Sequence, residues 1–87
     1  MLRSNIKKKL VKFIKSNFIK KSGIVLDDEM LLVENDIIDS TGVIELVLFL
    51  EETYKIKVED SEIAPETIGS INRIVDFIET KIEKNRD

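Results

Sequence analysis

Apolar residues follow a helical spacing near both ends of the chain. From Leu2 to Phe18 they recur at intervals of three and four residues, at Leu2, Ile6, Leu10, Phe13, Ile14 and Phe18. From Ser70 to Lys84 the same spacing holds, at Ile71, Ile74, Val75, Ile78 and Ile82. Because this spacing places side chains on one face, each stretch predicts an amphipathic α-helix. Ser70 is well placed to cap the second of these helices.

A third helix is predicted from Thr41 to Tyr54, and it has two distinct faces. At about 100° per residue, one arc collects a core face, made of Val43, Leu46, Val47, Leu50 and Tyr54. A second arc mixes carboxylates with two large aliphatic side chains, in Thr41, Ile44, Glu45, Leu48, Glu51 and Glu52. Exposed aliphatic residues surrounded by acids indicate a surface that docks a partner.

The segments between these helices are not strongly periodic. Ser22-Gly23 ends the first pattern, and the residues from Ile24 to Ile38 predict a long loop held over the helices by its own apolar side chains. Lys55 to Ile63 predicts a connection with a short turn, ended by Pro65, which biases Ala64 toward an extended backbone. The fold class is therefore all-α: a bundle of three main helices and one short helix, with a long loop between the first two.

Composition limits the chemistry that the chain can carry out alone. Its 87 residues predict a single domain, 1–87, with a modest core. The chain has no cysteine and no histidine, which excludes disulfides and thiolate metal sites and removes the commonest general base. We therefore predict a protein that is not an enzyme, with no catalytic residues and no metal site.

Charge is unevenly distributed along the chain. The net charge is −3, but residues 1–21 contain eight lysines and arginines and no acid, so the remainder is strongly acidic. An acidic body argues against nucleic acid as a partner and favours basic surfaces of other proteins. Because no continuous apolar run resembles a secretory signal or a membrane span, we predict a soluble, cytoplasmic monomer without membrane insertion.

The triplet Asp39-Ser40-Thr41 precedes the central helix and has two interpretations. Any of its three side chains could cap the helix by accepting a hydrogen bond from a free amide. Alternatively, Ser40 is a site of chemistry. It is not a conventional hydrolytic nucleophile, because the chain has no histidine, no Gly-x-Ser-x-Gly elbow surrounds it, and Val43 stands where a Ser-x-x-Lys motif needs lysine.

The chain resembles acyl carrier proteins through an ordered series of residues. The series contains Ile37-Ile38-Asp39-Ser40, Val43, Glu45-Leu46-Val47, Leu50-Glu51-Glu52, Tyr54, Ile56, Val58, Ile63-Ala64-Pro65-Glu66, Ile71 and Ile74-Val75-Asp76-Phe77-Ile78. The resemblance covers residues 35–82 well and the first helix only in character. It implies an acyl-carrier-like bundle in which a separate transferase, using magnesium, moves 4′-phosphopantetheine from coenzyme A onto Ser40.

The resemblance also implies a role and a set of partners. The thiol of the prosthetic group would carry acyl groups as thioesters between enzymes of fatty-acid, polyketide, lipid or related biosynthesis. Partners would be a phosphopantetheinyl transferase and the enzymes that load and transfer acyl groups, which present basic docking surfaces. The docking residues implied are Asp39, Thr41, Glu45, Glu51 and Glu52, with Ile44 and Leu48 as the apolar centre.

Two positions depart from the common pattern of the family. Thr41 stands where most fatty-acid carriers have leucine, and Gly42 follows in the first helical turn, where it lowers helix propensity. Asn35 replaces a frequent glycine, and asparagine tolerates left-handed backbone. Thr41-Gly42, the Ala64-Pro65-Glu66 segment and the basic first helix resemble specialised stand-alone carriers more closely, with a D-alanyl, aminoacyl or peptidyl carrier as an alternative. The cargo is chosen by the loading enzyme and cannot be read from the sequence.

An alternative of a different class is a non-catalytic interaction domain in which Ser40 is only a cap. Its active surface would be the basic first helix, where Lys8, Lys12 and Lys15 share one face. That surface would bind an anionic membrane or RNA. The opposite, apolar face of the same helix is the face that a bundle buries.

Overall fold

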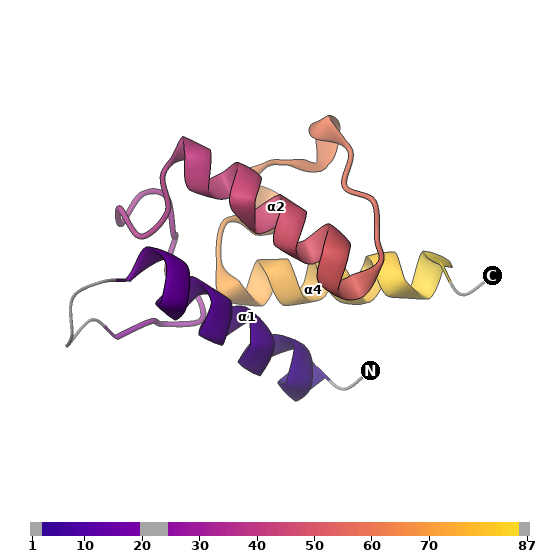
Figure 1. The fold of residues 1–87 in the computed structure, drawn as a ribbon, viewed down its shortest axis with the longest axis horizontal. Coiled ribbons are helices and arrows are strands. Elements are labelled where there is room, and N and C mark those ends of the chain that lie inside the picture. The colour runs from indigo at the N-terminus through magenta and orange to yellow at the C-terminus, as the bar shows by residue number, and fades with distance from the viewer. Residues whose placement is uncertain (1–2, 20–24, 86–87) are drawn as a thin grey trace.

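Four α-helices make up the fold in the computed structural model, which describes residues 3–19 and 25–85 (Figure 1). In order they are α1 (Arg3–Phe18), α2 (Ser40–Tyr54), the short α3 (Pro65–Ile68) and α4 (Ile71–Asn85), with a 3₁₀ turn η1 (Asp60–Glu62). No strand occurs among the described residues. The predicted all-α bundle of three main helices and one short helix is confirmed. The predictions for Leu2, Ser22-Gly23 and Ile24 lie outside the described residues.

The helix boundaries follow local chemistry. α2 begins at Ser40, one residue earlier than predicted. α4 begins at Ile71, and the Ser70 hydroxyl accepts a hydrogen bond from the Arg73 amide (3.3 Å), as expected of a cap. Pro65 ends the preceding connection because it starts α3, where its fixed φ suits the first helical position. Ala64 is extended (φ −152°, ψ 159°), as predicted.

The core lies where α4 meets the other helices, all of which contact it (Figure 1). The predicted apolar stripes supply its fully buried side chains, among them Ile6, Leu10, Ile14, Leu46, Leu50, Ile71, Ile74, Val75 and Ile78. Phe13, Phe18, Val43 and Ile82 are only partly buried at its margin. The Phe13 ring stacks on Phe49 with centroids 4.0 Å apart, which joins α1 to α2. Burial of large aliphatic side chains stabilises the fold by about 1.5–3 kcal/mol each.

The long loop before α2 is attached to the bundle through its own residues. Leu32 and Ile38 are buried, the Leu32 amide donates to the Gly69 carbonyl (2.9 Å), and the Asn72 amide donates to the Asp28 carbonyl (3.0 Å). For residues 25–38, the prediction of a loop held by apolar side chains is confirmed. These contacts fix the point at which the chain enters α2.

The turn at residues 32–36 of this loop contains a residue with left-handed backbone. The left-handed residue is Asp36 (φ 58°), and Asn35 is not among the residues with positive φ. The Asn35 side-chain amide instead donates to the Leu31 carbonyl (2.8 Å), so it closes the turn and the next residue reverses the chain. Aspartate, like asparagine, tolerates this conformation better than most residues.

Candidate functional site

The beginning of α2 is capped by Asp39. Its backbone is extended (φ −94°, ψ −177°), and its carboxylate accepts a hydrogen bond from the Gly42 amide (2.7 Å). Its carbonyl accepts from the Val43 amide (3.0 Å), which is the first bond of the helix. Of the three candidate caps in the sequence, Asp39 is therefore the one that performs this function.

Ser40 lies next to the cap and is exposed as the first residue of α2. Among the residues that the structure describes, no hydrogen bond involves its hydroxyl. The amides of Ser40 and Thr41 belong to the first turn, which has no partner within the helix for them. The positive end of the helix dipole favours a negatively charged group at this position. Ser40 thus combines a free hydroxyl with a local field that suits a phosphate ester.

The packing around position 42 explains why this residue is glycine, which the sequence alone did not reveal. The residue is buried, and a Cβ atom on it would lie 2.8 Å from Ile38 Cγ2 and 2.8 Å from Phe18 Cε1. Glycine therefore lets the end of α1 and the loop close against the first turn of α2. This packing offsets the loss of helix stability, about 1 kcal/mol, that glycine causes relative to alanine. It also holds the turn that presents Ser40.

The exposed face of α2 contains the aliphatic residues that the sequence assigned to docking. Ile44 is 61% exposed and Leu48 is 53% exposed, which is unusual for large aliphatic side chains. Thr41, Glu45 and Glu52 are also exposed. We call this surface the α2 strip, defined by Thr41, Ile44, Glu45, Leu48 and Glu52. On this surface two exposed aliphatic side chains lie beside two exposed carboxylates.

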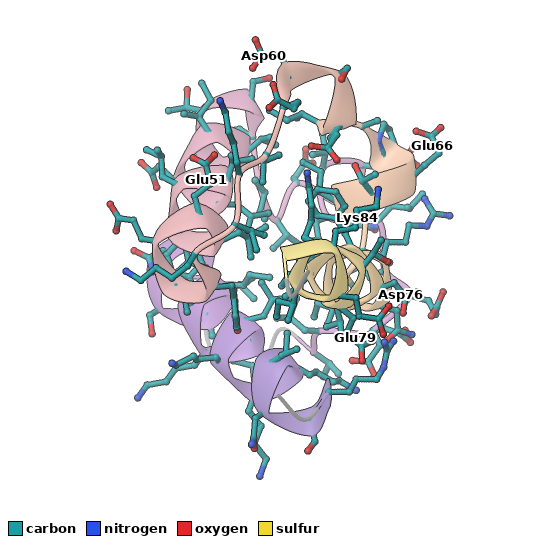
Figure 2. All side chains as sticks on the ribbon, turned by 90° about the vertical axis from the view of Figure 1, so that its right-hand side faces the viewer. Glu51, Asp60, Glu66, Asp76, Glu79 and Lys84 are labelled. Atoms are coloured by element: carbon teal, nitrogen blue, oxygen red, sulfur yellow. The ribbon has the colours of Figure 1, made fainter. Side chains whose placement is uncertain are left out.

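Glu51 differs from the other predicted docking residues. It is only partly exposed, and its Oε2 accepts a hydrogen bond from the Val58 amide (3.0 Å), so it fixes the segment that follows α2 (Figure 2). That segment places Ile56 and Val58 in the core. Glu51 therefore has a structural role within the fold, which the sequence pattern did not indicate.

An apolar groove lies on the other side of α2. It has a volume of about 230 Å³ and is lined by Leu31, Val33, Glu34, Val43, Ile63, Ala64, Pro65, Ile68 and Gly69. Val43 comes three residues after Ser40, about one helical turn along α2. The groove is built from three segments that are distant in sequence, so no local pattern could have predicted it.

The residues around Ser40 include neither a histidine nor, among the described residues, a cluster of metal-binding side chains. The chain has no histidine to act as a base. Within the described segments, no group of three or more acidic residues is placed to hold a metal ion.

No protein-family model matches the chain, and a comparison with curated proteins also gave no match. Among the described residues, no helix is long and apolar enough to cross a membrane.

The capping assignment predicts which of these neighbouring residues matters for stability. Asp39→Ala is expected to lower the free energy of unfolding by about 0.5–2 kcal/mol, because the Gly42 amide loses its acceptor. Asp39→Asn retains an acceptor and should cost much less. Urea unfolding followed by circular dichroism measures both variants. If Ser40→Ala destabilised the protein more than Asp39→Ala, Ser40 would have to be regarded as the cap.

Proposed function

We propose that the protein is an acyl carrier protein that bears 4′-phosphopantetheine on Ser40. In the loading step, the Ser40 oxygen forms a phosphodiester bond to the phosphorus of the phosphopantetheine arm. The bond from that phosphorus to the rest of coenzyme A breaks, so adenosine bisphosphate leaves, and the serine proton passes to the transferase. The terminal thiol of the arm then carries acyl groups as thioesters. This thiol supplies the nucleophile that a chain without cysteine lacks.

The observation that carries this proposal is the division of roles between Asp39 and Ser40. Because the Asp39 carboxylate caps α2 (2.7 Å to the Gly42 amide), capping does not account for the serine beside it. Ser40 is exposed, at the positive end of a 15-residue helix. A prosthetic arm attached there would extend into solvent and reach partner enzymes.

The α2 strip supports the proposed partners. Ile44 and Leu48 offer an apolar centre, and Glu45 and Glu52 offer negative charge beside it. Such a surface suits enzymes with basic docking sites, including the transferase and the enzymes that load acyl groups. Each exposed ion pair contributes only about 0–1 kcal/mol, so docking would be weak and fast. A carrier that visits several enzymes needs this kind of encounter.

The apolar groove favours an aliphatic acyl cargo over an aminoacyl cargo. Among the residues that the structure describes, its lining is apolar except for Glu34. Burial of the ammonium group of an aminoacyl cargo against such walls would be costly. A hydrocarbon chain would gain about 25 cal/mol for each Å² of apolar surface removed from water. A D-alanyl or other aminoacyl carrier remains the alternative, and loading assays with both classes of cargo would distinguish them.

Intact mass spectrometry tests the proposal directly. The protein is incubated with coenzyme A, magnesium and a broad-specificity phosphopantetheinyl transferase, and a reaction without the transferase is the control. We expect a mass increase of one phosphopantetheinyl group, mapped to Ser40 by fragmentation. If two different transferases gave no increase, the carrier proposal would fail.

A further inference from the structure

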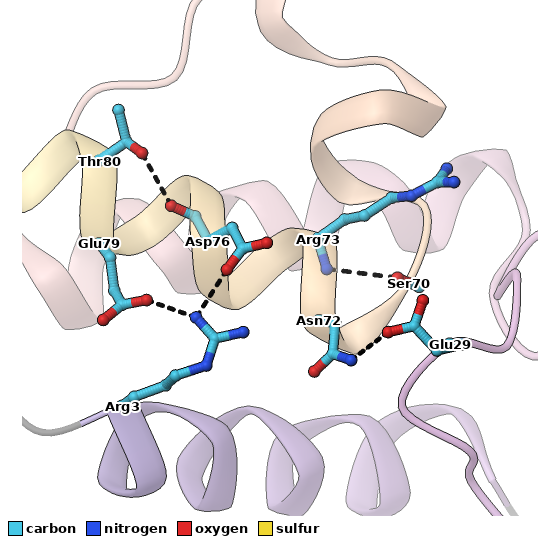
Figure 3. A network of polar contacts seen from close by, with 8 residues as sticks. All are labelled: Arg3, Glu29, Ser70, Asn72, Arg73, Asp76, Glu79 and Thr80. Atoms are coloured by element: carbon cyan, nitrogen blue, oxygen red, sulfur yellow. Dashed lines mark hydrogen bonds and ion pairs between the residues drawn. The ribbon is translucent and has the colours of Figure 1, made fainter.

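Two of the basic residues of α1 are engaged within the fold. Arg3 binds Asp76 (2.6 Å) and Glu79, both on α4 (Figure 3). The hydrogen bonds that Arg3 donates to these two carboxylates raise its pKa. Lys7 pairs with Asp28 of the loop before α2. Arg3 and Lys7 are therefore paired with carboxylates elsewhere in the fold.

The remaining lysines of α1 have no such contacts. Lys8, Lys9, Lys12 and Lys15 are exposed, and none forms an ion pair with a carboxylate among residues 3–19 and 25–85. Lys8, Lys12 and Lys15 follow one another at intervals of four and three residues, so they share one face of the helix. Nitrogen-tipped side chains project from α1 away from α4 (Figure 2). We call Lys8, Lys12 and Lys15 the α1 lysine face.

The composition of this face limits what it can recognise. α1 contains no acidic residue, and its single arginine, Arg3, is held by α4. The two aromatic residues of α1 contact other rings: Phe13 stacks on Phe49, and Phe18 lies edge-on to Phe13 at 5.7 Å. Single-stranded RNA is bound mainly through stacking aromatics and arginine. Tyr54 borders Lys8 and Lys12 but is only 7% exposed. The face therefore offers neither an accessible aromatic ring nor an arginine and is poorly suited to RNA.

A protein partner is also a poor match. Protein interfaces obtain most of their binding energy from buried aromatic, arginine or aliphatic anchors. The large side chains beside the α1 lysine face are Val11, which is partly buried, and Tyr54, which is buried. Polar Ser4, Asn5 and Ser16 complete the border. An array of hydrated ammonium groups on flexible stems instead suits a broad, diffuse negative surface. An anionic phospholipid bilayer has this character.

We propose that the α1 lysine face adsorbs to the surface of an anionic phospholipid bilayer. The attraction is electrostatic, because each lysine ammonium close to such a surface is drawn to the negatively charged headgroups and salt screens this attraction. The protein would lie on the headgroups without entering the hydrocarbon. This function does not involve Ser40 or the α2 strip, so it is independent of the proposed carrier role.

Co-sedimentation with lipid vesicles tests this proposal. The vesicles contain phosphatidylcholine with about 30% phosphatidylglycerol, and the measurement is made at roughly 0.05 M and roughly 0.5 M salt. We expect the protein to pellet with these vesicles at low salt and to be released at high salt. It should not pellet with vesicles of pure phosphatidylcholine. A triple variant with Lys8→Gln, Lys12→Gln and Lys15→Gln should partition at least about tenfold less.

A matched control variant distinguishes the effect of the α1 lysine face from the effect of net charge. Lys55→Gln, Lys57→Gln and Lys84→Gln remove the same charge at exposed positions outside α1, and this variant should pellet nearly as well as the wild type. Circular dichroism verifies that both variants fold, and Ser40→Ala should bind vesicles normally. The proposal is overturned if the wild type does not pellet at low salt, or if the two triple variants behave alike. Binding of an oligouridine strand without binding of vesicles would overturn it in favour of RNA.

Discussion

Replacement of Ser40 by alanine is expected to abolish the mass increase produced by the transferase while the fold is retained. Loss of the hydroxyl removes the only oxygen at this position that could form the phosphodiester bond. The side chain is exposed and Asp39 provides the cap, so the free energy of unfolding should change by less than about 0.5 kcal/mol. Intact mass and thermal unfolding by circular dichroism measure the two effects separately.

The adjacent hydroxyl offers a control for this experiment. Thr41→Ala removes a second exposed hydroxyl from the same helical turn and should leave loading in place. If Ser40→Ala were still loaded, the serine would be wrongly assigned. Ser61 would then be tested first, since it is exposed, whereas Ser70 is only 1% exposed and its hydroxyl already accepts a hydrogen bond from the Arg73 amide.

The long helices were predictable because their apolar residues recur with the helical period. The stripe of α4 from Ile71 to Ile78 is fully buried, and the predicted boundaries of α4 differ from the observed ones by one residue at each end. α3 is harder to place because its four residues are too few to show a period. Only Pro65, which favours the first turn of a helix, marks its position.

The details of the site depend on contacts between segments that are distant in sequence. Gly42 weakens a helix when it is considered alone, and its value becomes clear only when Phe18 and Ile38 are seen against it. Glu51 belongs to an acidic face by spacing, but its hydrogen bond goes to Val58. From the sequence, three neighbouring side chains were equal candidates for the helix cap: Asp39, Ser40 and Thr41. The choice among them depends on backbone angles, which the sequence pattern does not specify.

Leu50 and Leu48 lie two residues apart on α2, and substitution by alanine should have different effects on stability at the two positions. Leu50 is fully buried in the core, so Leu50→Ala is expected to lower the free energy of unfolding by about 2–5 kcal/mol. A small domain is stable by only about 5–15 kcal/mol, so this loss could leave a measurable unfolded fraction. Leu48 is 53% exposed, and Leu48→Ala should change stability by less than about 0.5 kcal/mol.

Leu48→Ala should instead weaken docking. If the α2 strip binds the transferase, removal of this exposed aliphatic side chain should lower kcat/KM for loading through a higher KM, with the folded structure retained. Urea unfolding and loading kinetics on both variants distinguish the two roles. Equal destabilisation by the two substitutions would mean that Leu48 belongs to the core. Unchanged kcat/KM for Leu48→Ala would mean that the transferase binds elsewhere, and the apolar centre of the strip would then need a different partner, because the Leu48 side chain has no role in the core.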